Sequence, residues 1–228
     1  GLALTNDAGS IDAVTLSGDG AISATFTTEL NGTGTAGYTQ AVTSTNTGSV
    51  TLTIDNMATS GDGSVITLGD ATNVITLAST MDDVITGGTG SDTLILGTVA
   101  GSAEEDLGSD TIDLGAGTDT LSFAGRTTGI VVNIGSTDAY LNDKDGNTAS
   151  TSETVAAGTL FDSEGATSGD VSTVAGVEVV IGGDGDDNIF GSTAGDTLDG
   201  GAGDDEITGG TGADVLTGGA GDDTFVLA

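Results

Sequence analysis

The stretch from Ile181 to Ala228, "IGGDGDDNIFGSTAGDTLDGGAGDDEITGGTGADVLTGGAGDDTFVLA", decides the fold because its pattern recurs every nine residues. From Gly182 onward it divides into the blocks 182–190, 191–199, 200–208, 209–217 and 218–226. Position six of these blocks is Asp187, Asp196, Asp205, Asp214 and Asp223, and position eight is Ile189, Leu198, Ile207, Leu216 and Phe225. The preceding block, 173–181, keeps the same spacing with Glu178 and Val180.

A period of nine fits neither an α-helix nor a heptad repeat. It predicts a tight turn followed by a very short strand, because glycine tolerates positive φ and the last residues of each block alternate in polarity. Two blocks then form one coil of 18 residues with two turns and two strands. Since a single coil cannot bury its apolar side chains, stacked coils must share a thin core.

The same spacing predicts a cation site at the turns. Turns on one edge would lie about 4.8 Å apart, which is the spacing of neighbouring strands. Carboxylates stacked at that distance repel one another unless a cation lies between them. Carboxylate and backbone carbonyl oxygens form a hard ligand set that suits Ca²⁺. Zinc would require His or Cys, and the chain contains neither.

The blocks follow the pattern GGxGxDxUx, in which U is apolar, and this pattern resembles the nonapeptide of RTX (repeats-in-toxin, hemolysin-type calcium-binding) proteins. The block 191–199 departs from it at Ser192 and Ala194, so we expect its turn to be the weakest. The resemblance implies an all-β fold, a right-handed parallel β-roll or β-solenoid with stacked calcium-binding turns. The glycines expected to contribute backbone ligands are Gly183, Gly185, Gly201, Gly203, Gly210, Gly212, Gly219 and Gly221.

The nine-residue grid continues upstream, where GGTGSDTLI (87–95) is a full match. Asp83, Asp92, Asp110 and Asp119 all fall on this grid, and the point at Gly101 lacks an acid, which we interpret as a loop or a degraded half-coil. Strict alternation then predicts two edges of stacked acids. One edge would hold Asp92, Asp110, Glu178, Asp196 and Asp214, and the other Asp83, Asp119, Asp187, Asp205 and Asp223.

The sequence predicts four segments. Residues 1–64 form a Thr/Gly-rich β region, either irregular coils of a solenoid or a small sandwich, and 65–122 and 173–228 form two roll segments. Residues 123–172 form a hairpin or loop insertion that leaves the side of the roll and includes a strand at "GIVVNI" (129–134). Within it, "DKDGN" is predicted to be a polar turn, because an EF-hand loop would need acids at Leu141 and Ser152.

The composition excludes several functions. The formal net charge is −33, with only Arg126 and Lys144 opposing 35 acids, so we expect no nucleic-acid partner and no attraction to anionic membranes. No apolar run approaches the roughly 20 residues that span a bilayer, so no membrane insertion is expected. Without His or Cys there is no imidazole base and no thiolate nucleophile, and we predict that the chain is not an enzyme.

The resemblance implies a protein that type I systems of Gram-negative bacteria secrete and that folds outside the cell, where calcium is plentiful. The family's C-terminal export signal is expected beyond Ala228. The Thr/Gly/Ala/Asp composition is most similar to that of calcium-dependent surface-layer (S-layer) proteins. Our first hypothesis is a structural segment of an S-layer or extracellular filament that self-assembles with calcium, with a surface glycan as a further candidate partner. The alternatives are a segment of a giant RTX adhesin and the folding roll of a secreted hydrolase or toxin.

Overall fold

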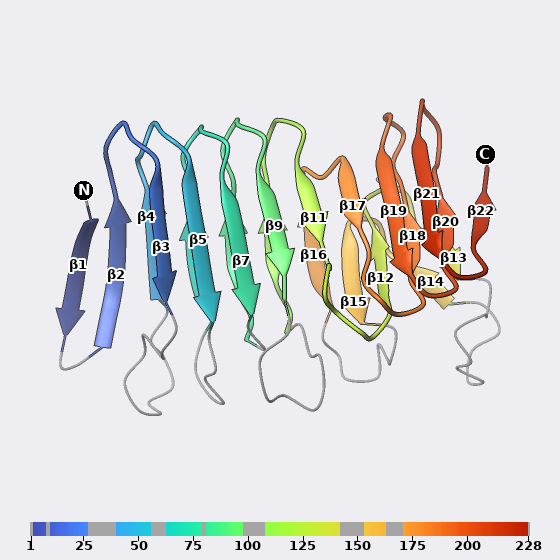
Figure 1. Cartoon of the computed structure of the whole chain (residues 1–228), viewed down its shortest axis with the longest axis horizontal. Coiled ribbons are helices and arrows are strands. Elements are labelled where there is room, and N and C mark those ends of the chain that lie inside the picture. The colour runs from blue at the N-terminus through green and yellow to red at the C-terminus, as the bar shows by residue number, and fades with distance from the viewer. Residues whose placement is uncertain are drawn as a thin grey trace.

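The computed structural model describes residues 2–7, 10–26, 40–55, 63–78, 81–97, 108–141, 153–162 and 171–227. Every regular element in these ranges is a β-strand. The strands follow one another along the long axis of the molecule, and the two termini lie at opposite ends (Figure 1). Since the described residues form no helix, none of them provides an apolar helix long enough to cross a membrane.

Most strands belong to two sheets, which we call the long sheet and the short sheet. The long sheet has 12 strands in the spatial order β1 (Leu2–Asp7), β2 (Ser10–Leu16), β4 (Gln40–Ser44), β6 (Ser64–Thr67), β8 (Val84–Thr86), β10 (Thr111–Asp113), β16 (Ser172–Ala175), β15 (Thr159–Asp162), β12 (Ile130–Asn133), β18 (Asn188–Phe190), β20 (Glu206–Thr208) and β22 (Thr224–Val226). The short sheet has eight strands in the order β21 (Val215–Ala220), β19 (Thr197–Ala202), β17 (Val179–Ile181), β11 (Thr120–Ser122), β9 (Thr93–Leu96), β7 (Val74–Ala78), β5 (Val50–Asp55) and β3 (Ile22–Phe26).

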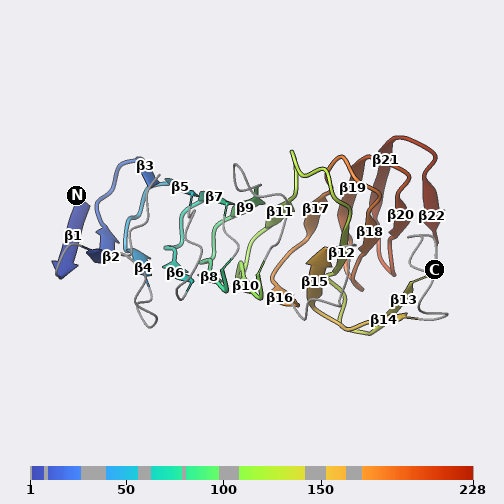
Figure 2. The ribbon, with the colours of Figure 1, turned by 90° about the horizontal axis from the view of Figure 1, so that it is seen from below.

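Outside β1 and the insertion, the chain alternates between the sheets, so that neighbouring strands of each sheet pair in parallel. Within the insertion, β15 pairs antiparallel with both β12 and β16. In the long sheet Ile85 of β8 lies beside Ile112 of β10, and in the short sheet Leu94 of β9 lies beside Leu121 of β11. Figure 2 shows the two sheets as facing layers along most of the molecule. This arrangement is a parallel β-roll, as the nine-residue period predicts.

The core is a thin layer of apolar side chains between the two sheets. In β8 and β10 only the middle residue is buried, as alternation along a strand requires. Ile189, Leu198 and Ile207, at position eight of the repeat, are fully buried. Burying each such side chain contributes about 1.5–3 kcal/mol. Phe225 is 45% exposed because β22 is the last strand of the long sheet.

The N-terminal strands continue both sheets. β2 pairs in parallel with β4, and β3 pairs in parallel with β5, in the same way as the strands of the later coils. Only β1 departs from this pattern, by pairing antiparallel with β2. Of the two alternatives for this region, the pairing is that of solenoid coils and not of a sandwich.

The insertion is built into the roll more deeply than the sequence predicts. β12 and β15 do not leave the side of the roll, because they lie within the long sheet between β16 and β18. All four residues of β12 are buried, since Ile130 and Val132 face the core while Val131 packs against Phe190 and Val155 on the outer face. A strand covered on both faces belongs inside a sheet. The predicted hairpin is present as β13 (Ala139–Leu141) paired with β14 (Glu153–Val155), and "DKDGN" lies outside the described residues.

Candidate calcium-binding edges

The acids at position six line the two edges of the roll where the chain passes between the sheets. Most of them are buried, and those at most 3% exposed are Asp83, Asp92, Asp110, Asp119, Asp187, Asp196 and Asp205. A buried carboxylate is costly unless hydrogen bonds or a positive charge compensate it. The surroundings of these acids therefore decide what the edges can bind.

Most of these carboxylates accept a backbone N–H group of the preceding coil. The Asp187 N–H donates to Oδ1 of Asp205 at 2.8 Å, and the Asp205 N–H donates to Oδ1 of Asp223 at 3.2 Å. The second oxygen of Asp187, Oδ2, accepts the N–H of Gly183 in its own turn at 2.8 Å. These contacts fix the carboxylates in columns in which neighbours are one strand spacing apart, about 4.8 Å.

The structure corrects the predicted distribution of two acids between the edges. The Asp83 N–H donates to Oδ1 of Asp110 at 2.8 Å, and the Asp92 N–H donates to Oδ1 of Asp119 at 2.6 Å. Asp110 therefore stacks on Asp83, and Asp119 stacks on Asp92, which is the reverse of the prediction. The reason is that β8 pairs directly with β10 and β9 with β11, so this coil spans 27 residues instead of 18. Gly101 lies outside the described residues.

We call the two columns the first and the second edge. The first edge, where the chain passes from the long to the short sheet, holds Asp92, Asp119, Glu178, Asp196 and Asp214. The second edge holds Asp83, Asp110, Asp187, Asp205 and Asp223. On the first edge Glu178 replaces aspartate, and its Oε2 accepts the Asp119 N–H at 2.9 Å. On the second edge the strands β16, β15 and β12 separate Asp110 from Asp187, and Oγ of Ser172, at the start of β16, accepts the Asp110 N–H at 2.9 Å.

The predicted glycines allow consecutive turns to touch backbone to backbone. Gly203 has φ +124°, and a Cβ there would lie 2.4 Å from the carbonyl oxygen of Gly185 in the preceding coil. Gly201 stands in the same relation to Gly183, with φ +100° and a distance of 2.3 Å. The further glycines with positive φ at these positions are Gly210, Gly212, Gly219 and Gly221. The carbonyl oxygen of Gly183 accepts the Ala202 N–H at 2.9 Å, which leaves its second lone pair for another ligand.

Burial makes the charged form of three of these acids, Asp119, Asp187 and Asp205, unfavourable in the bare chain. Desolvation raises the pKa of Asp187 to about 7 and that of Asp205 to about 6, although backbone N–H groups partly oppose the shift. Desolvation also raises the pKa of Asp119, and the negative charges of Asp92 and Glu178 add to the effect. The buried Oδ2 atoms of Asp119 and Asp205 have no hydrogen-bond partner among the described residues. A cation beside these oxygens would compensate both the burial and the repulsion.

The oxygen ligands at the edges suit Ca²⁺, and most of them would be backbone carbonyls and not side chains. Among the residues that the structure describes, no three acidic side chains converge in the way that a side-chain metal site requires. An ion at either edge would therefore be held by one or two position-six carboxylates together with turn carbonyls. Ca²⁺ accepts 6–8 oxygen ligands in flexible geometry, whereas Mg²⁺ requires a stricter octahedron.

Two residues without a predicted role lie in these turns. Arg126 is 1% exposed, and its carbonyl oxygen accepts the Asp184 N–H at 2.7 Å, so its turn stacks beneath the one that begins at Gly183. Asn73 is also 1% exposed and immediately precedes β7, as Asp92 precedes β9. Aligning the chain by its strands would have found Asn73, whereas the nine-residue grid misses it by one position.

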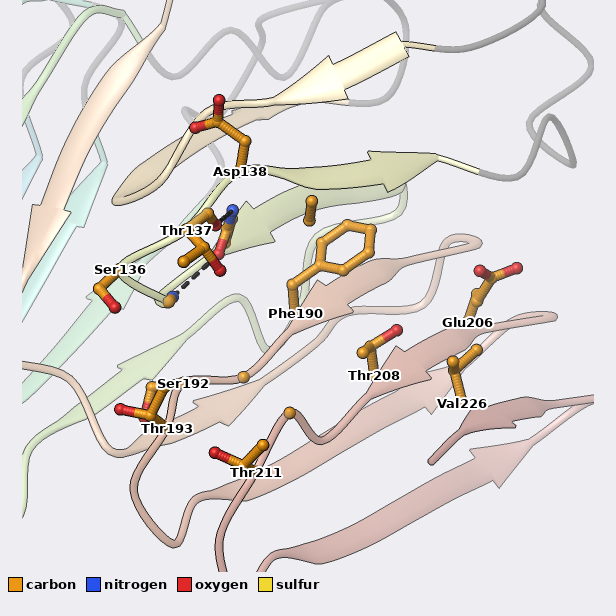
Figure 3. Close-up of a pocket in the computed structure, with 15 residues that line it drawn as sticks. Ser136, Thr137, Asp138, Phe190, Ser192, Thr193, Glu206, Thr208, Thr211 and Val226 are labelled. Atoms are coloured by element: carbon orange, nitrogen blue, oxygen red, sulfur yellow. Dashed lines mark hydrogen bonds between the residues drawn. The ribbon is translucent and has the colours of Figure 1, made fainter. Parts of the chain in front are cut away.

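A pocket of roughly 390 Å³ lies on the outer face of the long sheet (Figure 3). Its walls carry mainly Ser and Thr side chains, together with Phe190, Asp138 and Glu206. Figure 3 shows Asp138 and Glu206 on different walls, one from the insertion and one from β20. Since the chain lacks His and Cys, this pocket offers no nucleophile activated by an imidazole base.

Comparisons with known proteins agree with this geometry. The family model of the RTX calcium-binding nonapeptide repeat matches four copies, at residues 78–98, 106–124, 173–207 and 190–225. All ten acids of the two edges fall within the matched residues. No curated protein matches the chain. The matched residues thus carry RTX calcium-binding nonapeptide repeats.

Proposed function

We propose that the chain is a calcium-stabilised structural segment of a secreted bacterial protein and, more specifically, part of an S-layer or extracellular filament. The observation that carries this proposal is the pair of columns of buried carboxylates, in which Oδ2 of Asp119 and of Asp205 lacks a hydrogen-bond partner among the described residues. A divalent ion shared between neighbouring coils would give these oxygens the partner that they lack.

In this proposal the turns orient the ligands before the ion arrives. The N–H groups of Gly183 and Ile130 hold the two oxygens of Asp187 at 2.8 Å each, so the carboxylate loses little freedom on binding. When bound, calcium supplies positive charge that stabilises the ionised carboxylates. Since only the stacked coils bring the ligands together, the binding energy stabilises the folded state alone. Extracellular calcium modules typically have Kd values of about 10⁻⁴–10⁻³ M, so the roll would fold after export.

The outer face of the short sheet supports a role in assembly. Its outward positions carry Thr51, Thr93, Thr120 and Thr197, which lie in one register row across the sheet with Val74, Val179 and Val215. Because threonine and valine side chains are short, this face of the sheet is flat, and another copy of the chain can pack closely against it. We propose no catalytic role for this surface or for the acidic edges.

The proposal is tested by comparing the purified chain in millimolar calcium, in EGTA and in magnesium as the matched ion. We expect a compact particle by X-ray scattering in calcium alone, and ordered sheets or filaments by electron microscopy that chelator disperses. An equal melting temperature in EGTA would refute the calcium role. Compact monomers that never assemble but adhere to cells would refute the S-layer role and favour an adhesin.

A further inference from the structure

Asn73 occupies the place of a position-six acid in a turn that lies outside the matched repeats. The side-chain Nδ2 of Asn73 donates to the carbonyl oxygens of Gly69 and Ala71 at 3.1 and 2.5 Å, and to Oδ1 of Asp92 at 2.8 Å. Gly69 and Ala71 stack beneath Gly88 and Gly90, so they stand at positions two and four of their turn. The three oxygens around Nδ2 are therefore two turn carbonyls and one carboxylate of the next coil.

This is the type of oxygen set that a calcium ion would take at the acidic turns. The amide nitrogen carries two polar hydrogens and presents positive charge to the oxygens, as a cation would. Asn73 also keeps the two backbone contacts that the aspartates make at the acidic turns. Its Oδ1 accepts the Val50 N–H of the preceding coil at 3.1 Å, and its own N–H donates to Oδ1 of Asp92 in the next coil at 2.9 Å. Asn73 thus links three successive coils with a donor of its own.

The neighbouring positions follow the same principle. Asn46, which is 2% exposed, donates from Nδ2 to the carbonyl oxygens of Gly20 and Gly48 at 2.7 and 2.8 Å, and so joins two coils. On the second edge the coil of β6 and β7 has Ser64 where the following coils have Asp83 and Asp110. Ser64 thus removes one carboxylate from the second edge, and the turns before β5 and β7 close with the amides of Asn46 and Asn73.

We propose that the amide groups of Asn73 and Asn46 replace calcium in the N-terminal coils, so that these coils fold without the ion and offer a preformed end on which the calcium-dependent coils stack. The inference rests on the proposed calcium role of the acidic edges. It assigns to one chain a region that is independent of calcium and a region that requires it.

Hydrogen exchange of the full chain, with and without calcium, tests the proposal. In wild-type protein in EGTA, we expect amides of 64–78 to exchange at least about tenfold more slowly than those of 197–208. In EGTA, Asn73→Asp should raise the exchange rate of the 64–78 amides by about tenfold, because the side-chain donor is lost and a second negative charge faces Asp92. Calcium should restore their protection. Asn73→Ala should expose 64–78 in both conditions, since it neither donates nor binds an ion.

Equilibrium dialysis gives an independent readout. Asn73→Asp should bind one more calcium ion per chain than wild type, whereas the matched control Asn188→Asp, which adds the same charge on the sheet surface, should bind no more. Wild-type protein in which 64–78 opens in EGTA together with 197–208 overturns the inference and leaves the calcium role intact. An Asn73→Asp variant that gains no ion also overturns it. If EGTA leaves 197–208 protected, both proposals fail, because there is then no calcium to be replaced.

Discussion

The N-terminal coils around β5 to β7 and the C-terminal coils around β17 to β22 have the same architecture but close their turns differently. Both stack parallel strands over a single row of inward apolar side chains, such as Ile75 in one region and Leu198 in the other. In the N-terminal region, buried amides donate to the turn carbonyls. In the C-terminal region, buried carboxylates occupy the turns. The comparison shows that the strands alone do not complete this fold, because each turn also needs a positive partner for its oxygens.

Truncating the core should give the largest difference between the regions. With calcium present, Ile75→Ala and Leu198→Ala should each destabilise their region by about 2–5 kcal/mol, because both side chains are fully buried. In EGTA, Ile75→Ala should retain this cost, while Leu198→Ala should have none, since its coils are already open. Urea unfolding followed by hydrogen exchange of each region measures both effects. An equal cost of Leu198→Ala in the two conditions would contradict the division.

A side chain at the glycine stack should destabilise the C-terminal coils next most strongly. Gly203→Ala combines φ +124° with a contact of 2.4 Å to the Gly185 carbonyl, so we expect a loss of about 1–3 kcal/mol and weaker calcium affinity. The matched control is Gly20→Ala in an N-terminal turn, where a Cβ would meet nothing within 4 Å and should change stability by less than about 0.5 kcal/mol. Thermal melts in calcium compare the two variants, and similar melting temperatures would refute close stacking at Gly203.

Acidification should act on the two regions differently. The pKa of an unfolded aspartate is about 3.9, whereas burial raises the pKa of Asp187 to about 7 and that of Asp205 to about 6. The folded calcium-free coils therefore hold the protons more tightly, so their stability is greatest below about pH 4 and falls as the pH rises toward about 7. In EGTA, residues 197–208 should be better protected at pH 5 than at pH 7.5. In saturating calcium, residues 197–208 should instead be better protected at pH 7.5 than at pH 5, because protons compete with the ion for the carboxylates. Residues 64–78, with Asn73 in place of aspartate, should change little under either condition.

The smallest effect is expected at the irregular turn of block 191–199. The Ser192 hydroxyl donates to Oδ1 of Asp196 at 3.2 Å and accepts the Ala194 N–H at 3.0 Å. Ser192→Ala should therefore cost about 0.5–1.5 kcal/mol, and the exposed neighbour Thr193→Ala should cost less. Calcium titrations followed by thermal melts measure the difference. A Ser192→Ala variant as stable as wild type would show that the hydroxyl does not support this turn.

The repeat predicted the roll and the acids at its turns because both follow from local spacing. A turn, a triplet strand and an acid at position six recur within nine residues, and the positions of Asp187, Asp196 and Asp205 required no long-range information. The same reasoning failed at Asp110 and Asp119, where one coil of 27 residues changes which turns share an edge. Coil length depends on which strands pair, and the spacing of acids along the chain does not encode that pairing.

Other features depend on contacts that sequence patterns do not show. β12 and β15 enter the long sheet because Val131 finds apolar partners on the outer face, including Phe190, 59 positions later in the chain. Asn73 has its role through three oxygens, one of which belongs to the next coil. Arg126 is buried, although nothing in the sequence pattern around it indicates this. In each case, tertiary packing decided the outcome over local preference.

The two strands that the insertion adds to one sheet have a mechanical consequence. Between β16 and β18 the long sheet gains β15 and β12, whereas in the short sheet β17 is followed directly by β19 (Figure 2). At about 4.8 Å per strand, one side of the molecule is longer by about 10 Å over the same coils. We therefore expect the stacking axis to curve toward the shorter side at this point, where Ile130–Asn133 and Thr159–Asp162 are added.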